Sequence, residues 1–164
     1  MSTHDLTRLA SNASPPTDAG SQANELDALL ETAATQIAGN LFRHDPPRSG
    51  EIERAIDFIE DELMRPGAPV APAAPGAALW STAPALQAWA AVSGPTLTVE
   101  LVEQWFQRLA LAAHGQTGAL QGLPPGGEAA ASLLVLREFM HHRGHAAITV
   151  AAARKTLVAP PPSA

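Results

Sequence analysis

The sequence predicts a mainly all-α protein, a compact bundle of about five helices, and three observations lead to this prediction. Apolar residues make up 46% of the chain, and much of that share is alanine, which favours helix more than any other residue. Four Phe, three Trp and no Tyr leave few of the aromatic side chains that β-sandwiches favour. In several segments large apolar residues recur at steps of three and four, which places them on one helical face.

The 164 residues indicate one domain with two loose ends. Residues 1–23 are rich in Ser, Thr, Asn, Asp and Pro, and we expect a disordered tail because they bury too little apolar surface to offset their ordering entropy. Residues 24–158 are expected to form a single helical domain, within which residues 66–79 are a Pro/Ala-rich connecting loop. Residues 159–164 contain consecutive prolines and are expected to be a disordered C-terminal tail.

Prolines delimit the first two predicted helices. Apolar residues at helical spacing predict a first helix over residues 24–42, and Pro46 and Pro47 exclude helix directly after it. Ser49 is suited to the N-cap of a second helix, which ends before Pro66. The buried stripe expected on this second helix comprises Ile52, Ala55, Ile56, Ile59 and Leu63.

The residues at their starts indicate where the third and fourth predicted helices begin. A third helix is expected over residues 82–92, with Pro84 in the first turn, where proline is tolerated. Thr98 is a good N-cap for a fourth helix, which runs to His114 and ends at Gly115. Its apolar residues share one side, which is typical of a helix packed on one face.

The fifth predicted helix runs over residues 128–143 and ends at Gly144. It is apolar over most of its circumference, so we expect it to be the central and most buried helix. Residues 146–150 fit either one short C-terminal strand or a final helical turn, because periodicity does not separate these alternatives over so few residues.

Charge and composition exclude several classes of function. The net charge is −6, and the only adjacent basic pair is Arg154 and Lys155, so neither nucleic acid nor an anionic membrane surface is an expected partner. The absence of cysteine excludes disulfides, thiolate chemistry and Fe–S clusters. No apolar run is long enough to span a membrane, and the first residues lack the pattern of a signal peptide, so we expect a cytoplasmic protein. The high content of Ala, Pro and Gly, and the preference for Arg over Lys, suggest a bacterial genome rich in G and C.

A group of histidines at the end of the fifth predicted helix forms the first candidate site. Spacings of three and four residues place a carboxylate and an imidazole on one helical face. Helices present ligands to a divalent transition metal such as zinc or iron in this way. The candidate ligands are Glu138, His141, His142 and His145, with His114 as an addition. Gly144 weakens the pattern by separating His145 from the helix. The competing interpretation, which the sequence favours, is that these histidines simply complement the negative end of the helix dipole.

Acidic residues on the second predicted helix form the second candidate site. Asp57, Glu60 and Asp61 are the candidate contacts for a protein partner, which would be basic. Acids near a helix C-terminus are disfavoured by the helix dipole, which indicates a basic partner or a neighbouring arginine. The competing interpretation is an ordinary solvated helix face.

The remaining motifs give little support to catalysis. The glycine-rich segment 115–127 lacks the Lys-Ser or Lys-Thr of a P-loop and is expected to be a connector. There is no Gly-x-Ser-x-Gly motif, and Lys155 is the only lysine, so covalent catalysis has few available nucleophiles. We expect no catalytic residues.

These features predict a small, soluble bacterial accessory or interaction protein without catalytic activity of its own. A homodimer is compatible with them, because the region of Trp80 and Trp89 and the uncharged connecting loop would leave apolar surface exposed. One alternative is a metal-dependent protein or hydrolase that uses the cluster at the end of the fifth helix. A second alternative is a small-molecule-binding domain with an apolar pocket between the alanine-rich helices.

Overall fold

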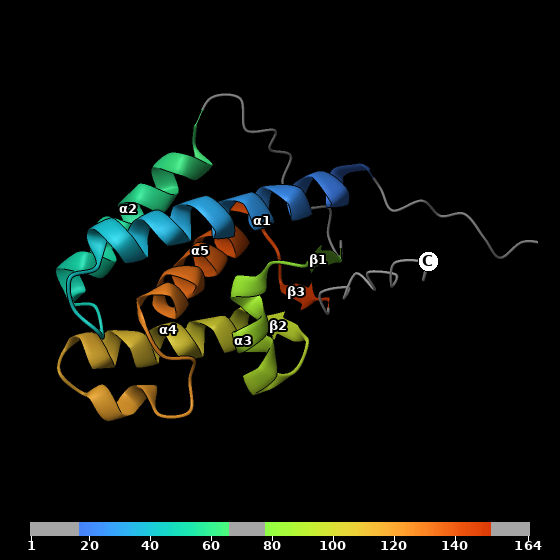
Figure 1. Cartoon of the computed structure of the whole chain (residues 1–164). Helices are drawn as coiled ribbons and strands as arrows, with labels where there is room; N and C mark the ends of the chain where they lie inside the picture. Colours follow the sequence, from blue (N-terminus) through green and yellow to red (C-terminus); the bar gives the residue numbers. More distant parts are fainter. Residues whose placement is uncertain (1–16, 66–77, 152–164) are drawn as a thin grey trace, which may run out of the picture.

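The computed structural model describes residues 17–65 and 78–151, which form five α-helices and a small three-stranded sheet (Figure 1). The predicted mainly α-helical fold is confirmed. The helices are α1 (Thr17–Gln36), α2 (Ser49–Leu63), α3 (Pro84–Ser93), α4 (Val99–Ala113) and α5 (Gly127–Arg143). None of these helices is long and apolar enough to cross a membrane.

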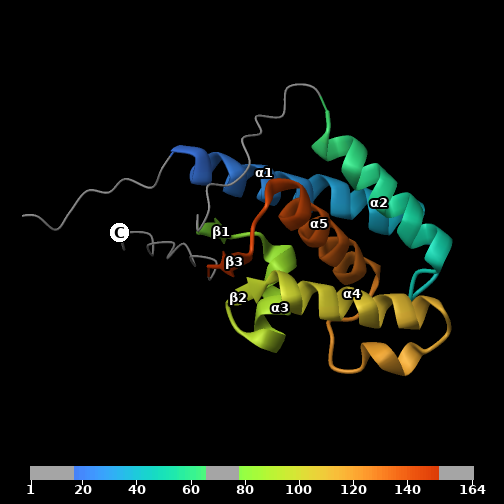
Figure 2. The same cartoon turned by 180° about the vertical axis from the view of Figure 1, so that it is seen from behind.

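Helix α5 forms the centre of the bundle, as its apolar circumference predicts. It contacts α1, α2, α3 and α4, and the views from the front and from behind both show it between its neighbours (Figures 1 and 2). All residues from Ala130 to Met140 are buried except Arg137, which is half-buried. A helix surrounded on all sides needs apolar residues on all sides, which explains why residues 129–136 of α5 include only one polar side chain, that of Ser132.

Helix α1 begins earlier than its composition predicts. It starts at Thr17, so residues 17–23, which we assigned to a disordered tail, are helical. Gln22 is 6% exposed and Ala23 packs against the core, so tertiary packing extends the helix into a polar segment that its composition alone would leave disordered. Residues 1–16 of that predicted tail and the predicted tail 159–164 lie outside the described residues. At its other end α1 continues into a π-helical segment, Ile37–Leu41.

The sheet joins three short strands at one end of the bundle (Figure 1). The strands are β1 (Leu79–Ser81), β2 (Thr96–Thr98) and β3 (Ala147–Val150), in the order β1-β3-β2. Strand β3 runs parallel to β1 and antiparallel to β2. Leu79, Ile148 and Leu97 are adjacent in the register and all buried, so they form one apolar row across the sheet.

Three features of the sheet bear on the sequence predictions. Residues 147–150 are a strand and not a helical turn, which decides between the two alternatives. Leu79 belongs to β1, so the predicted connecting loop 66–79 extends too far by one residue at that end, and residues 66–77 lie outside the described residues. Strands β1 and β2 were not predicted, because three residues are too few to show an alternating pattern.

The helix ends follow the predicted capping chemistry, with one difference. The Thr98 hydroxyl accepts a hydrogen bond from the Leu101 N–H at 3.3 Å, and Gly144 ends α5 with a φ of 73°. In α2 the cap position is held by Arg48 rather than Ser49. The Glu51 carboxylate accepts from the N–H groups of Arg48 and Arg43, at 2.8 Å each, and fastens the preceding loop to the start of α2.

Candidate functional site

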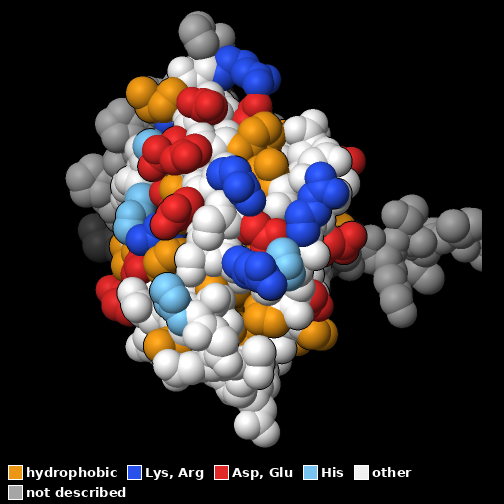
Figure 3. Space-filling model, turned by 90° about the vertical axis from the view of Figure 1, so that its left-hand side faces the viewer, with side chains coloured by type: hydrophobic (Ala, Val, Ile, Leu, Met, Phe, Trp, Pro, Cys, Tyr) orange, Lys and Arg blue, Asp and Glu red, His pale blue; other side chains and the backbone are white. Residues whose placement is uncertain are grey.

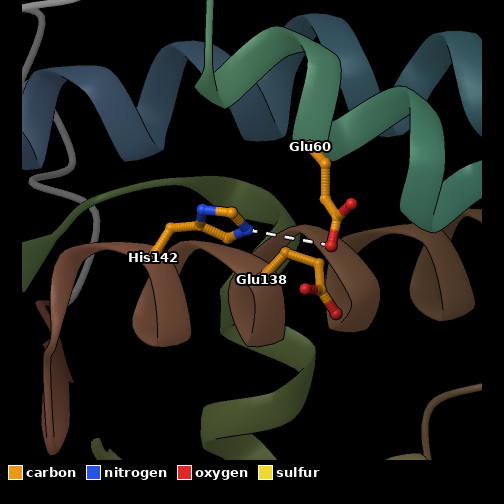
Figure 4. Close-up of side chains that lie close together, drawn as sticks. All are labelled: Glu60, Glu138 and His142. Carbon is orange, nitrogen blue, oxygen red and sulfur yellow. Dashed lines mark ion pairs between the residues drawn. The ribbon is translucent and has the colours of Figure 1, made fainter.

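Glu60, Glu138 and His142 form a cluster between α2 and α5 (Figure 4). Each side chain offers one ligand atom, and the three atoms lie within 4.8 Å of one another. Glu138 and His142 are four residues apart and share a face of α5, while Glu60 reaches them from α2. His142 Nε2 lies 3.8 Å from Glu60 Oε1. The cluster thus combines two residues of the predicted metal site with one residue of the predicted partner surface.

The cluster is buried at its base and open at its rim. Glu138 is only 4% exposed, and its Oε1 accepts a hydrogen bond from Arg137 Nη1 at 2.5 Å. The side chains of His142 and Glu60 are 28% and 48% exposed. Arg137 offsets the charge of the buried carboxylate through Oε1, while solvent reaches the side chains of His142 and Glu60. An ion therefore has both a ligand at the base and a path of entry.

The donor set is suited to a divalent transition metal. One imidazole and two carboxylates are typical ligands of zinc, iron or manganese, whereas Mg²⁺ and Ca²⁺ take oxygen ligands. Two ligands that are each about 2.0–2.2 Å from one ion lie at most ~4.4 Å apart. A small rotation of the exposed Glu60 or His142 side chain would bring the three atoms to that spacing, and three protein ligands would leave a position open for water.

The structure brings His141 to a different neighbour. His141 Nε2 lies 2.8 Å from Glu103 Oε1 of α4, and the same carboxylate oxygen accepts from Arg137 Nε at 2.8 Å. The guanidinium carbon of Arg137 lies 4.1 Å from the ring centroid of Phe106. His141 therefore contacts α4, where it shares the Glu103 carboxylate with Arg137, and it does not belong to the cluster with Glu60.

His145 and His114 also lie apart from the cluster. His145 follows Gly144, is 5% exposed, and stacks on Phe139 with ring centroids 5.8 Å apart and an interplanar angle of 4°. Neither of its ring nitrogens has a hydrogen-bond partner among the described residues. Burial lowers the pKa of the His145 imidazole, which favours the neutral ring. His114 is exposed at the C-cap of α4.

The predicted acidic surface on α2 is exposed, but basic side chains accompany it. Asp57, Glu60 and Asp61 are all exposed. Arg54 precedes Asp57 by one turn, and Arg65 forms an ion pair with Glu62 at the end of the helix. The face shown in Figure 3 likewise carries acidic, basic and histidine side chains intermixed. The acids near the C-terminus of α2 thus have a neighbouring arginine, one of the two explanations the sequence left open.

A groove that the sequence analysis missed lies between α1, the start of α3 and the start of α5. Its volume is about 610 Å³, and three carboxylates line it: Asp27 and Glu31 from α1 and Glu128 from α5. These residues are far apart in the sequence and follow no motif, so only the packing of the helices brings them together.

No protein-family model, no curated protein and no solved structure matches the chain.

Proposed function

We propose that this chain is a non-catalytic helical protein that binds one divalent transition metal ion between α2 and α5. The observation that carries the proposal is the convergence of Glu60, Glu138 and His142 to within 4.8 Å from two helices. The spacing of Glu138 and His142 on one helix could arise by chance. Glu60 on the facing helix adds a third ligand, which chance spacing along α5 does not explain. The absence of a nucleophile motif in the sequence supports binding without catalysis.

The position of the cluster suggests what the ion would do. It would cross-link α2, which lies on the outside of the bundle, to the central helix α5 (Figure 1). An ion that binds the folded chain and not the unfolded chain stabilises the fold in proportion to the logarithm of its concentration. We therefore expect a metal-stabilised scaffold that acts as a small accessory protein in the bacterial cytoplasm.

The test uses untagged, full-length protein from which metal has been removed with a chelator. Zn²⁺ is titrated by calorimetry, and Co²⁺ is followed by its visible absorption. We expect one ion per chain and a rise in the thermal midpoint with added Zn²⁺. His142→Ala and Glu60→Gln each remove a direct ligand, so each should weaken binding by at least the factor of about 10–100 that is typical of removing a group that only supports a ligand.

The matched control is His141→Ala, which removes a neighbouring exposed histidine whose partner is Glu103. It should leave Zn²⁺ affinity unchanged. The proposal is overturned if the wild-type protein shows no saturable binding, or if His141→Ala weakens binding as much as His142→Ala does.

A second function that we propose is binding to a basic protein partner through exposed carboxylates. Asp57, Glu60 and Asp61 are exposed together on α2, which suits such a contact. We also propose that the chain associates with a second copy of itself, because Trp80 is 58% exposed on β1. Light scattering over a range of concentrations would detect this dimer. Loss of binding in Asp57→Asn/Asp61→Asn, with Zn²⁺ affinity retained, would separate this function from metal binding.

A further inference from the structure

We infer that the groove between α1 and the starts of α3 and α5 docks a basic segment of a protein partner, with Arg or Lys side chains on its acidic rim. This inference is independent of metal binding, because the groove shares no residue with Glu60, Glu138 and His142. The groove also shares no residue with the exposed acidic face of α2, so the two surfaces are tested by separate variants.

The shape of the groove is suited to a chain segment. Its volume of about 610 Å³ holds several side chains, and its floor is apolar, formed by the buried Leu30 and Ala83. Glu31, Thr82, Pro84 and Glu128 are exposed along it. A small-molecule site encloses most of its ligand, whereas an open groove with an exposed polar rim and an apolar floor leaves a peptide partly in solvent.

Among residues 17–65 and 78–151, no basic side chain offsets the charge of the groove. Three of the residues that line it are acidic and none is Lys or Arg. Within residues 17–65 and 78–151, neither Glu31 nor Glu128 forms an ion pair. This distinguishes the groove from α2, where Arg54 and Arg65 lie among the acids. Complementary charge steers and orients a basic partner more than it adds affinity.

Asp27 is held in place by the chain itself. Its Oδ1 accepts from the Ser81 hydroxyl at 2.5 Å, and its Oδ2 accepts from the hydroxyl and the N–H of Thr82, at 3.1 and 3.3 Å. These donors are neutral, so they orient the carboxylate without cancelling its charge. A carboxylate oriented in advance loses little entropy when a guanidinium or ammonium group binds to it.

The test is fluorescence anisotropy with a labelled synthetic octapeptide of alternating Arg and Leu, added to full-length protein in the presence of a chelator. The same peptide with Glu in place of Arg is the negative probe. We expect the Arg peptide to bind saturably and the affinity to fall at high salt. Glu31→Gln/Glu128→Gln should weaken binding by about tenfold.

The matched control is Glu53→Gln/Asp57→Asn, which removes two negative charges from α2, as many as the test variant removes from the groove. All four substituted residues are exposed, so both double variants should fold as the parent does. An equal loss in the two double variants would overturn the inference, because net charge would then explain the binding. A larger loss in the α2 variant would overturn it in favour of the predicted acidic face.

The chain's own Arg154 and Lys155 are the competing occupant. The N–H of Ala151 donates to the Ser81 carbonyl at 2.8 Å, next to Thr82 of the groove. Full-length Arg154→Ser/Lys155→Ser is therefore titrated with the same peptide. Binding at unchanged affinity supports a partner, and binding that occurs only in this variant overturns the inference, because the tail would then be the natural occupant.

Discussion

Arg143, the last residue of α5, donates two hydrogen bonds to the carboxylate of Glu25 in α1, 118 residues earlier in the chain. The distances from Nε and Nη2 to the carboxylate oxygens are 3.2 and 2.5 Å. Nη2 also donates to the carbonyl oxygen of Leu63, the last residue of α2, at 3.3 Å. One buried guanidinium thus joins three helices at the end of the bundle beside the sheet.

Replacement of Arg143 should destabilise the fold more than replacement of an exposed arginine. Arg143→Met leaves the carboxylate of Glu25 and the carbonyl of Leu63 without their donor in a buried setting, and should lower the free energy of unfolding by about 3–5 kcal/mol. Arg65→Met, which breaks an exposed pair with Glu62, should cost less than about 1 kcal/mol. Urea denaturation measures both, and equal losses would show that the Arg143 contacts contribute no more than a surface ion pair.

The helices were predictable because the residues that start, stop and bury each helix lie within or next to it in the sequence. The apolar stripe of α2, the Thr98 cap of α4 and the Gly144 stop of α5 are local features, and the structure has all three. The strands carry no such signal. Strand β1 exists because Leu79 pairs with Ile148, and strand β2 because Leu97 does, so both depend on contacts distant in the sequence.

The candidate site was predictable only in the part that lies on one helix. The four-residue spacing of Glu138 and His142 placed them on one face of α5, but no local pattern selects Glu60 as their neighbour. His141 and His142 are adjacent, and successive residues of a helix point about 100° apart, so they reach different neighbours, Glu103 of α4 and Glu60 of α2. His145 lies beyond Gly144, where the helical spacing no longer applies.

Glu51 should make the stability depend on pH in the acid range. Burial raises the pKa of its carboxyl, but hydrogen bonds from Arg48, His44 and Arg43 outweigh this and lower the pKa to about 2, from an ordinary value of 4.5. The folded state therefore binds the proton less readily than the unfolded state. Its stabilising contribution should be complete above pH 4.5 and be lost as the pH falls towards 2.

Glu51→Gln tests this contribution. The amide keeps the size of the side chain but lacks the charge, and it should lower the free energy of unfolding at pH 7 by about 1–3 kcal/mol. Glu53→Gln, an exposed neighbour, is the control and should have little effect. If the variant and the wild type lose stability in parallel between pH 4.5 and 2, Glu51 is not the source of the acid sensitivity.

Two glycines should respond to alanine in opposite directions. Gly144 has a φ of 73°, so Gly144→Ala forces an L-residue into the left-handed region and should cost about 1 kcal/mol. Gly50 lies in the first turn of α2, and nothing lies within 4 Å of an added Cβ, so Gly50→Ala should stabilise by about 0.4–1 kcal/mol. Thermal unfolding of the two variants checks the signs, and a loss of stability in Gly50→Ala would contradict the helical environment described for it.

His145 should make the fold less stable as the pH falls below neutrality. Burial lowers the pKa of its imidazole below the ordinary value of 6.5, so the unfolded chain takes up a proton before the folded chain does. The stability is therefore complete above pH 6.5 and declines as the pH falls from there through the lower pKa of the folded state.

His145→Phe should remove this part of the pH dependence. The replacement ring can keep the stacking on Phe139, and it eliminates two buried nitrogens that have no hydrogen-bond partner among the described residues. The variant should be at least as stable as the wild type at pH 8, and its advantage should grow as the pH falls to 5. Chemical denaturation at both pH values measures the difference. An advantage that stays constant would mean that His145 is protonated as easily in the folded chain as in the unfolded one, which its burial against Phe139 argues against.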